Sequence, residues 1–286
     1  MELGVLDNAN LEGAKFTEAT LLQVSFEKAK LTGAVFDRAR FERVNFTGAD
    51  LAALTFEGLS LVRSTFRECD LAGRRFVRCD LTGSDFVRAK LAGAVFEDCD
   101  LTHATLSEAD LEGASFVRVT AKGATFLDAK LMRANLEEAQ LRYASFSRAT
   151  LVDTSLAGAD LRETVFDEAK APGANFRGAK LEYTDLSHAN LEGACFDGAD
   201  LSRANLHRVS DAGASYTNAT TLTTKRDDAE RKAAEDWQPP PMPEALRLAL
   251  EARMRGEDAP LPSVRGEAIP ASRGPSSRGP SSQGGS

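Results

Sequence analysis

The feature that most constrains this chain is a five-residue period that keeps one phase from Leu6 to Tyr216. Of the 43 positions at this phase, 23 are Leu and 16 are Phe, and these 16 are all the phenylalanines of the protein. A random distribution over the five phases would gather every Phe at one of them with a probability on the order of 10⁻¹¹. The repeat therefore outranks any local preference for helix or strand.

A second pattern accompanies the first, two residues before each Leu or Phe. The side chain at this site is small, and Ala occupies 27 of the 43 positions. The unit reads A-(D/N/K/S/T)-(L/F)-X-X, as at 109–113 (ADLEG) and 189–193 (ANLEG). This unit resembles the pentapeptide repeat family, over roughly three quarters of the chain.

A period of five matches neither the 3.6 residues of a helical turn nor the alternation of a strand, so each unit must turn the chain. The resemblance implies an all-β solenoid, a right-handed quadrilateral parallel β-helix, with four units per coil and the Leu, Phe and small residues inside. Every fourth unit then forms a stack: Phe predominates in the stacks through Phe16 and Phe26, and Leu in the other two. About eleven coils at roughly 4.8 Å each predict a rod on the order of 50 Å long.

Three segments are expected along the chain. The β-helix covers 1–221, a helical cap or dimerisation segment covers 222–256, and a Pro/Ser/Gly/Arg tail at 257–286 is too polar to bury a core and is expected to be disordered. Short helices are predicted near 225–237 and 243–255. Because a solenoid end exposes unpaired edges, this segment is the natural cap, and we predict a homodimer through Trp237, Leu246 and Leu250.

Neither catalysis nor a cofactor is expected, because a filled prism with flat walls provides no converging groups. Cys69, Cys79 and Cys99 fall at the small inward site and are interpreted as buried hydrophobes, whereas Cys195 faces outward. His188 and His207 are expected on adjacent coils of one face, but two histidines alone do not make a metal site. With no apolar run long enough to span a bilayer and no signal peptide, the protein is expected to be soluble and cytoplasmic, without membrane, nucleic-acid or small-molecule ligands.

Negative charge is concentrated in the repeats, where residues 1–220 hold 25 Lys and Arg against 33 Asp and Glu. The wall that carries Leu6 and Phe26 has the largest excess of acids and is the candidate protein-binding wall, with Glu68, Asp85, Glu108, Asp128, Asp167, Glu168 and Asp185.

Two functions stay open. One is a scaffold that presents its walls to a protein partner. The other, suggested by the resemblance, is a mimic of duplex DNA that binds the type II topoisomerases DNA gyrase or topoisomerase IV and protects against gyrase poisons, although the loops of some such proteins are missing here. A duplex carries about one negative charge per 1.7 Å, far more than this rod.

One stretch breaks the small-residue rule. The seven successive sites from Leu54 to Ser84 lack Ala, and Arg74 places a guanidinium where the phase points inward. Because an unpaired buried charge is costly, either Arg74 reaches out to solvent or the wall opens locally. Two interpretations remain: a repacked, wider coil, or a basic patch of Arg74, Arg75 and Arg78 for an anionic partner. Ala121 and Ala171 each leave a Leu-sized side chain out of a stack, which predicts a void or a bend.

Overall fold

The structure, a computed structural model, describes residues 3–51, 54–227 and 229–236. The chain forms two compact units, Met1–Ala233 and Ala234–Ser286, and the first contains the repeats. The second predicted helix, the contacts Trp237, Leu246 and Leu250, and the tail at 257–286 lie outside the described residues.

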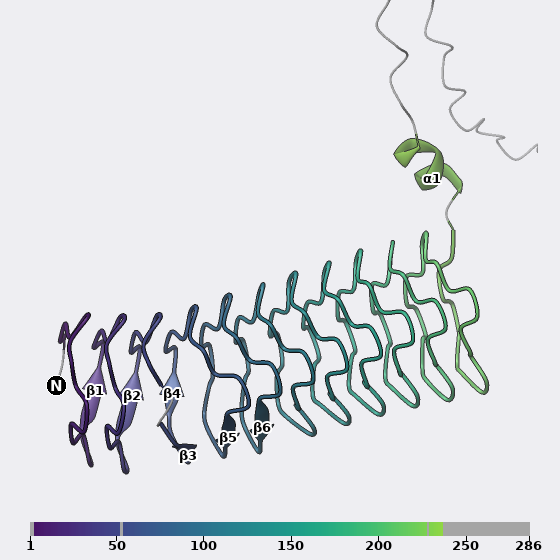
Figure 1. The fold of residues 1–286 in the computed structure, drawn as a ribbon. Coiled ribbons are helices and arrows are strands. Elements are labelled where there is room, and N and C mark those ends of the chain that lie inside the picture. Colours follow the sequence, from purple (N-terminus) through teal and green to yellow (C-terminus); the bar gives the residue numbers. More distant parts are fainter. Residues whose placement is uncertain (1–2, 52–53, 228, 237–286) are drawn as a thin grey trace, which may run out of the picture. The chain divides into compact units, whose positions relative to one another are not determined.

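Parallel pairing between residues twenty apart organises the first unit. Bridges run in this spacing from Val5 with Ser25 to Asn205 with Lys225. One coil therefore takes twenty residues, or four repeat units, and Figure 1 shows these coils stacked along the rod from purple to green. The predicted four-sided parallel β-helix is confirmed. Pairing extends to Lys225, two units beyond that of Tyr216.

Within the described part of the chain, regular strands appear only between Thr20 and Glu97, because elsewhere each wall contributes a single bridged residue. One parallel sheet orders β1 (Thr20–Leu22), β2 (Arg40–Glu42) and β4 (Leu61–Val62), and a second orders β3 (Phe56–Glu57), β5 (Arg75–Val77) and β6 (Val95–Glu97). Helix α1 (Ala229–Glu235) falls within the first predicted helix, 225–237.

The corners explain why a five-residue unit suffices to turn the chain. The residue two places after each Leu or Phe adopts a left-handed backbone, as at Gly13 (φ 67°) and Arg118 (φ 56°). The small residue that follows returns its N–H to the carbonyl of the Leu or Phe, as from Ala114 to Leu111 at 3.0 Å. A small side chain is required there because this inward site lies against the crowded core.

The predicted aromatic stacks fill the core. Phe126 stacks on Phe146, with ring centroids 4.7 Å apart and planes 2° from parallel. On opposite sides of the core, Phe76 and Phe86 make an edge-to-face contact, with ring centroids 6.2 Å apart. These are the two arrangements that aromatic quadrupoles favour. Backbone pairing continues through Ala121 and Ala171, each of which donates its N–H to the next coil at 2.8 Å. The missing side chains therefore do not interrupt the ladder.

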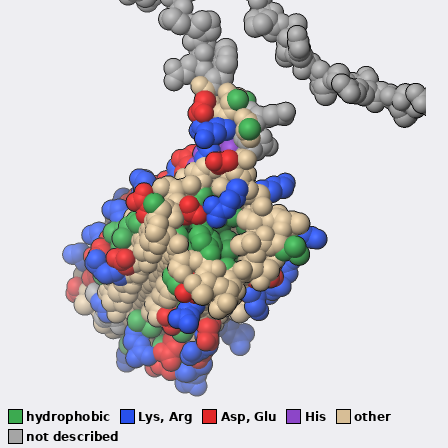
Figure 2. Space-filling view, turned by 90° about the vertical axis from the view of Figure 1, so that its right-hand side faces the viewer, with side chains coloured by type: hydrophobic (Ala, Val, Ile, Leu, Met, Phe, Trp, Pro, Cys, Tyr) green, Lys and Arg blue, Asp and Glu red, His purple; other side chains and the backbone are tan. Residues whose placement is uncertain are grey.

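The C-terminal end of the ladder exposes part of the core, and Figure 2 shows hydrophobic side chains at the centre of that face. Tyr216 extends one aromatic stack by lying on Phe196 at 5.0 Å. Its hydroxyl donates to Asp211 at 2.8 Å, and Arg226 pairs with the same carboxylate at 3.2 Å. Asp211, which replaces a stack Leu, is thus partnered where the core closes.

Candidate interaction surfaces

The predicted acidic wall is partly neutralised by arginines of neighbouring coils. Three of its seven acids form ion pairs with Arg: Glu68 with Arg88 at 3.3 Å, Asp85 with Arg67 at 2.7 Å, and Asp128 with Arg148 at 2.7 Å. The Arg148 guanidinium also holds the pKa of Asp128 below its ordinary value. Arginines therefore interrupt the negative charge of this wall, which does not form a uniform anionic field.

The remaining acids of that wall divide into two kinds. Asp167 accepts a hydrogen bond from the Ser187 hydroxyl at 3.2 Å, and Asp185 accepts from Asn205 at 2.9 Å. Glu108 and Glu168 have no ion pair among the residues that the structure describes. As a binding surface this wall stays a prediction, with Glu108 and Glu168 as its two uncommitted carboxylates.

The three arginines of the predicted basic patch do not act as one cationic cluster. Arg75 pairs with Glu97 at 2.6 Å, and Arg78 pairs with Glu57 at 2.5 Å. The Arg74 side chain is half-buried, so it reaches outward from the small inward site. Recruitment of an anionic partner by these residues also stays a prediction, and it would have to compete with the two glutamates.

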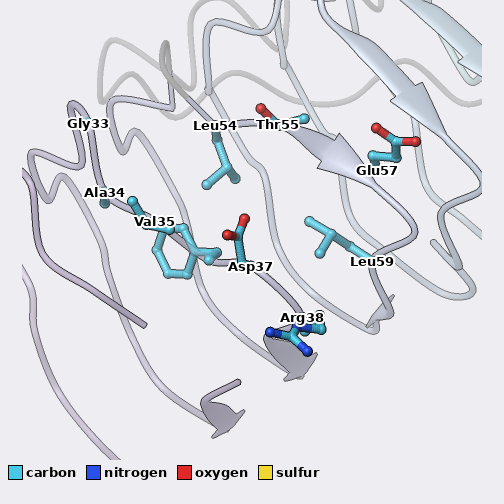
Figure 3. Close-up of a pocket in the computed structure, with 10 residues that line it drawn as sticks. Gly33, Ala34, Val35, Asp37, Arg38, Leu54, Thr55, Glu57 and Leu59 are labelled. Carbon is cyan, nitrogen blue, oxygen red and sulfur yellow. The ribbon is translucent and has the colours of Figure 1, made fainter. Parts of the chain in front are cut away.

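The wall does open, but one coil earlier than Arg74. Val35 pairs with Lys15 on one side, whereas among the described residues no bridge joins Val35 to Thr55. A cleft of about 500 Å³ lies at this break, lined by Phe36, Asp37, Arg38 and Glu57 together with Leu54 and Leu59 (Figure 3). The Phe stack is broken at the same place, because Phe36 contacts Phe41 rather than continuing to Phe56.

Two large side chains lie at the opening. Leu54 and Leu59 occupy consecutive sites where Ala is the rule, and each retains 6 % exposure. Because overpacking a close-packed core displaces the backbone, we expect these two side chains to separate this coil from the one before it. The sequence contained this signal, since Leu54 and Leu59 begin the stretch without Ala.

The cysteines lie as the phase predicts, whereas His207, at an outward position of the repeat, is buried. Cys69, Cys79 and Cys99 are buried, and Cys195 is partly exposed. The Cys69 thiol donates to the Phe46 carbonyl at 2.9 Å, and burial raises its pKa to about 11. His188 and His207 lie on neighbouring coils with ring centroids 5.7 Å apart.

Three exposed residues on another side of the rod were missed by the sequence reasoning. Tyr143, Val165 and Tyr183 are exposed by 55 %, 36 % and 55 %. Their spacing in the sequence could have revealed them: Tyr143 and Tyr183 are forty residues apart, so they lie two coils apart at the same position of the repeat.

With the coil and its walls established, the repeat identifies the class of protein. A family model described as a pentapeptide repeat region matches residues 5–76, 54–126 and 74–146, and a model of eight pentapeptide repeats matches 129–167 and 172–208. The chain belongs to the pentapeptide repeat proteins.

Solved structures of this class resemble the chain at low identity. Full-length QnrB1, a plasmid-mediated fluoroquinolone resistance protein, is 20% identical, with 82% of this chain and 98% of that one covered and a TM-score of 0.33. HetL, a pentapeptide repeat protein involved in heterocyst differentiation regulation in Nostoc sp. strain PCC 7120, is 26% identical, with 77% and 88% covered and a TM-score of 0.28. No curated protein matches the chain. Among the described residues, no helix has the length and apolar character needed to cross a bilayer.

Proposed function

We propose that this protein is a non-enzymatic, cytoplasmic interaction scaffold that presents the walls of a rigid rod to a protein partner. The observation that carries the proposal is the inward packing of the repeats, which directs the chemistry of the chain outward. Phe126, Phe146 and Phe166 are fully buried in one continuous stack. Variation at the outward positions therefore changes the surface without changing the fold, as in other repeat proteins.

The scaffold is tested by site-specific photo-cross-linking at the four corners of one coil. Asp128, Arg133, Glu138 and Tyr143 share the left-handed backbone and each point from a different corner. Each is replaced in turn by p-benzoyl-phenylalanine in the living host, and adducts are mapped by mass spectrometry. A scaffold predicts adducts concentrated at one or two corners. Their absence from all four, with the protein folded and expressed, would reject it.

A second candidate is modulation of a type II topoisomerase by mimicry of duplex DNA. The supporting observation is the anionic excess of the repeats, with 33 acids against 25 bases in residues 1–220. The interleaved ion pairs weigh against it, since a duplex presents phosphates of one sign only. A gyrase supercoiling assay with and without a fluoroquinolone separates the two functions. If micromolar protein neither inhibits supercoiling nor protects gyrase from the drug, this candidate is removed.

A further inference from the structure

Exposed apolar side chains away from the rod ends gather on one side. Six large hydrophobic residues are exposed among those described, and Leu3, Val5 and Leu222 belong to the terminal coils. The other three, Tyr143, Val165 and Tyr183, occupy three successive coils. We define the tyrosine corner as the five turns at 122–123, 142–143, 162–163, 182–183 and 202–203 together with Val165.

Backbone hydrogen bonds fix these turns one above another. Tyr143 donates its N–H to Arg162 at 3.2 Å, and Tyr183 donates to Ser202 at 3.1 Å. Val165 lies just past the corner, bridged to Ser145 below and Asp185 above. The two tyrosines are two coils apart, about 10 Å, and Glu163, which pairs with Arg142, occupies the turn between them beside Val165.

Arginines hold both tyrosine rings in place. The Arg142 guanidinium carbon lies 4.8 Å from the centre of the Tyr143 ring, and that of Arg203 lies 5.2 Å from the Tyr183 ring. Arg203 also donates a hydrogen bond to the Tyr183 hydroxyl. Ordering an aromatic side chain before association reduces the entropy lost on binding. Tyr and Arg are also the residue types that dominate binding energy at protein interfaces.

The charge of the tyrosine corner is opposite to that of the other corners. Its turns carry four bases and two acids: Lys122, Arg142, Arg162, Arg203, Glu163 and Glu182. Over the same coils, each of the other three corners has more acids than bases. Arg142 and Arg162 are committed to Glu163 and Asp160, whereas Lys122 and Arg203 form no ion pair with a carboxylate among the described residues. Cations without a carboxylate partner among the described residues therefore lie at both ends of the apolar row, Lys122 at one and Arg203, in contact with Tyr183, at the other.

The tyrosine corner is also where the rod departs from what stability alone would favour. Tyr143 and Tyr183 adopt left-handed backbones, with φ of 65° and 62°, as the residues at the same phase of the other turns do, so the backbone does not set this corner apart. Only two side-chain polar atoms of the described residues are buried without a hydrogen bond, Arg142 Nε and Glu182 Oε2, and both belong to this corner. Local departures of this kind concentrate at functional sites.

We propose that the tyrosine corner binds an acidic, extended segment of a partner protein. An apolar or aromatic side chain of that segment packs against Val165 and the two tyrosines, and its carboxylates face Lys122 and Arg203. This inference rests on the proposed scaffold function and specifies the surface and the partner's chemistry. It is distinct from DNA mimicry, which would present acids to a basic partner.

The test uses a library of random twelve-residue peptides displayed on phage and selected on the full-length protein. The best peptides are synthesised with a fluorophore, and their affinity is measured by fluorescence anisotropy. The binding variant is Tyr143→Gly with Tyr183→Gly, which is expected to keep or raise Tm because Gly relieves the left-handed strain. The matched control is Arg118→Gly with Glu138→Gly, the same change of conformation and phase on another corner.

The expected peptides contain several Asp or Glu around an apolar residue. Their affinity should fall about tenfold or more in the tyrosine variant and in Lys122→Glu with Arg203→Glu, and less than about twofold in the control. Failure to enrich acidic peptides, or equal binding to wild type and tyrosine variant, overturns the inference. A DNA duplex that binds more tightly than the peptides, and only when the tyrosines are present, assigns the corner to nucleic acid instead. Cross-links from Asp128, Arg133 or Glu138 but not Tyr143 would retain the scaffold and reject this corner.

Discussion

At the scale of single residues, Arg74 shows what the small inward site tolerates. Its side chain reaches outward and is half-buried, while its backbone keeps the ladder by accepting a hydrogen bond from Val95 at 2.8 Å. Arg74→Ala restores the common residue and should raise the free energy of unfolding by about 1 kcal/mol. Ala94, at the same site one coil later, is fully buried. Ala94→Arg should therefore cost roughly 3 kcal/mol, because that coil is closed. Urea denaturation measures both, and a loss of stability in Arg74→Ala would show that the guanidinium is needed.

Cys69 gives the rod a pH dependence at its core. The thiol is buried, and burial raises its pKa from 9.0 in the free side chain to about 11. The folded state therefore holds this proton more tightly than the unfolded chain, so its contribution to stability is complete below pH 9 and is lost as the pH rises towards 11. Relative to Cys69→Ala, wild type should lose about 2 kcal/mol between pH 8 and pH 11. Parallel stability profiles of the two proteins would contradict the prediction.

At the scale of the structural element, the broken wall predicts uneven protection of backbone amides. The N–H groups of Phe116 and Arg118 donate to the next coil at 2.7 and 2.9 Å. Phe36 and Arg38 occupy the same phase, yet neither N–H has a backbone partner among the described residues. Their hydrogen exchange should be about 100-fold faster than that of Phe116 and Arg118.

The same experiment tests the cause of the opening. If Leu54 and Leu59 separate the coils by overpacking, Leu54→Ala with Leu59→Ala should slow exchange at Phe36 and Arg38 and leave Phe116 unchanged. Exchange that stays fast in this variant would place the cause elsewhere, for example in the unusual ring of Phe41, which replaces a stack Leu.

These elements also show how far the sequence determines the structure. The period of five predicts the coil, the Phe stacks and the buried cysteines, because every unit repeats the same turn and core contacts. It does not locate the cleft, because the position of an opening depends on how the coil that holds Leu54 and Leu59 packs against its neighbour. The sequence does not predict the tyrosine corner for another reason. Tyr143, Val165 and Tyr183 form a surface only after the chain has been wound into coils of twenty residues.

At the scale of the whole molecule, the predicted homodimer through the C-terminal segment can be tested without damaging the rod. Pairing of Lys225 with Asn205 and of Arg226 with Asp211 shows that the ladder needs residues beyond Thr221. A chain that ends after Asp227 keeps these contacts and removes Trp237, Leu246 and Leu250. Multi-angle light scattering should then report a dimer for the full chain and a monomer for the shortened one, since the apolar residues of the segment would supply the interface. Trp237→Ala with Leu246→Ala and Leu250→Ala in the full chain should have the same effect, which separates loss of side chains from loss of length. The same number of chains per particle for the full and shortened proteins would contradict dimerisation through this segment and leave the walls of the rod as the surfaces available for association.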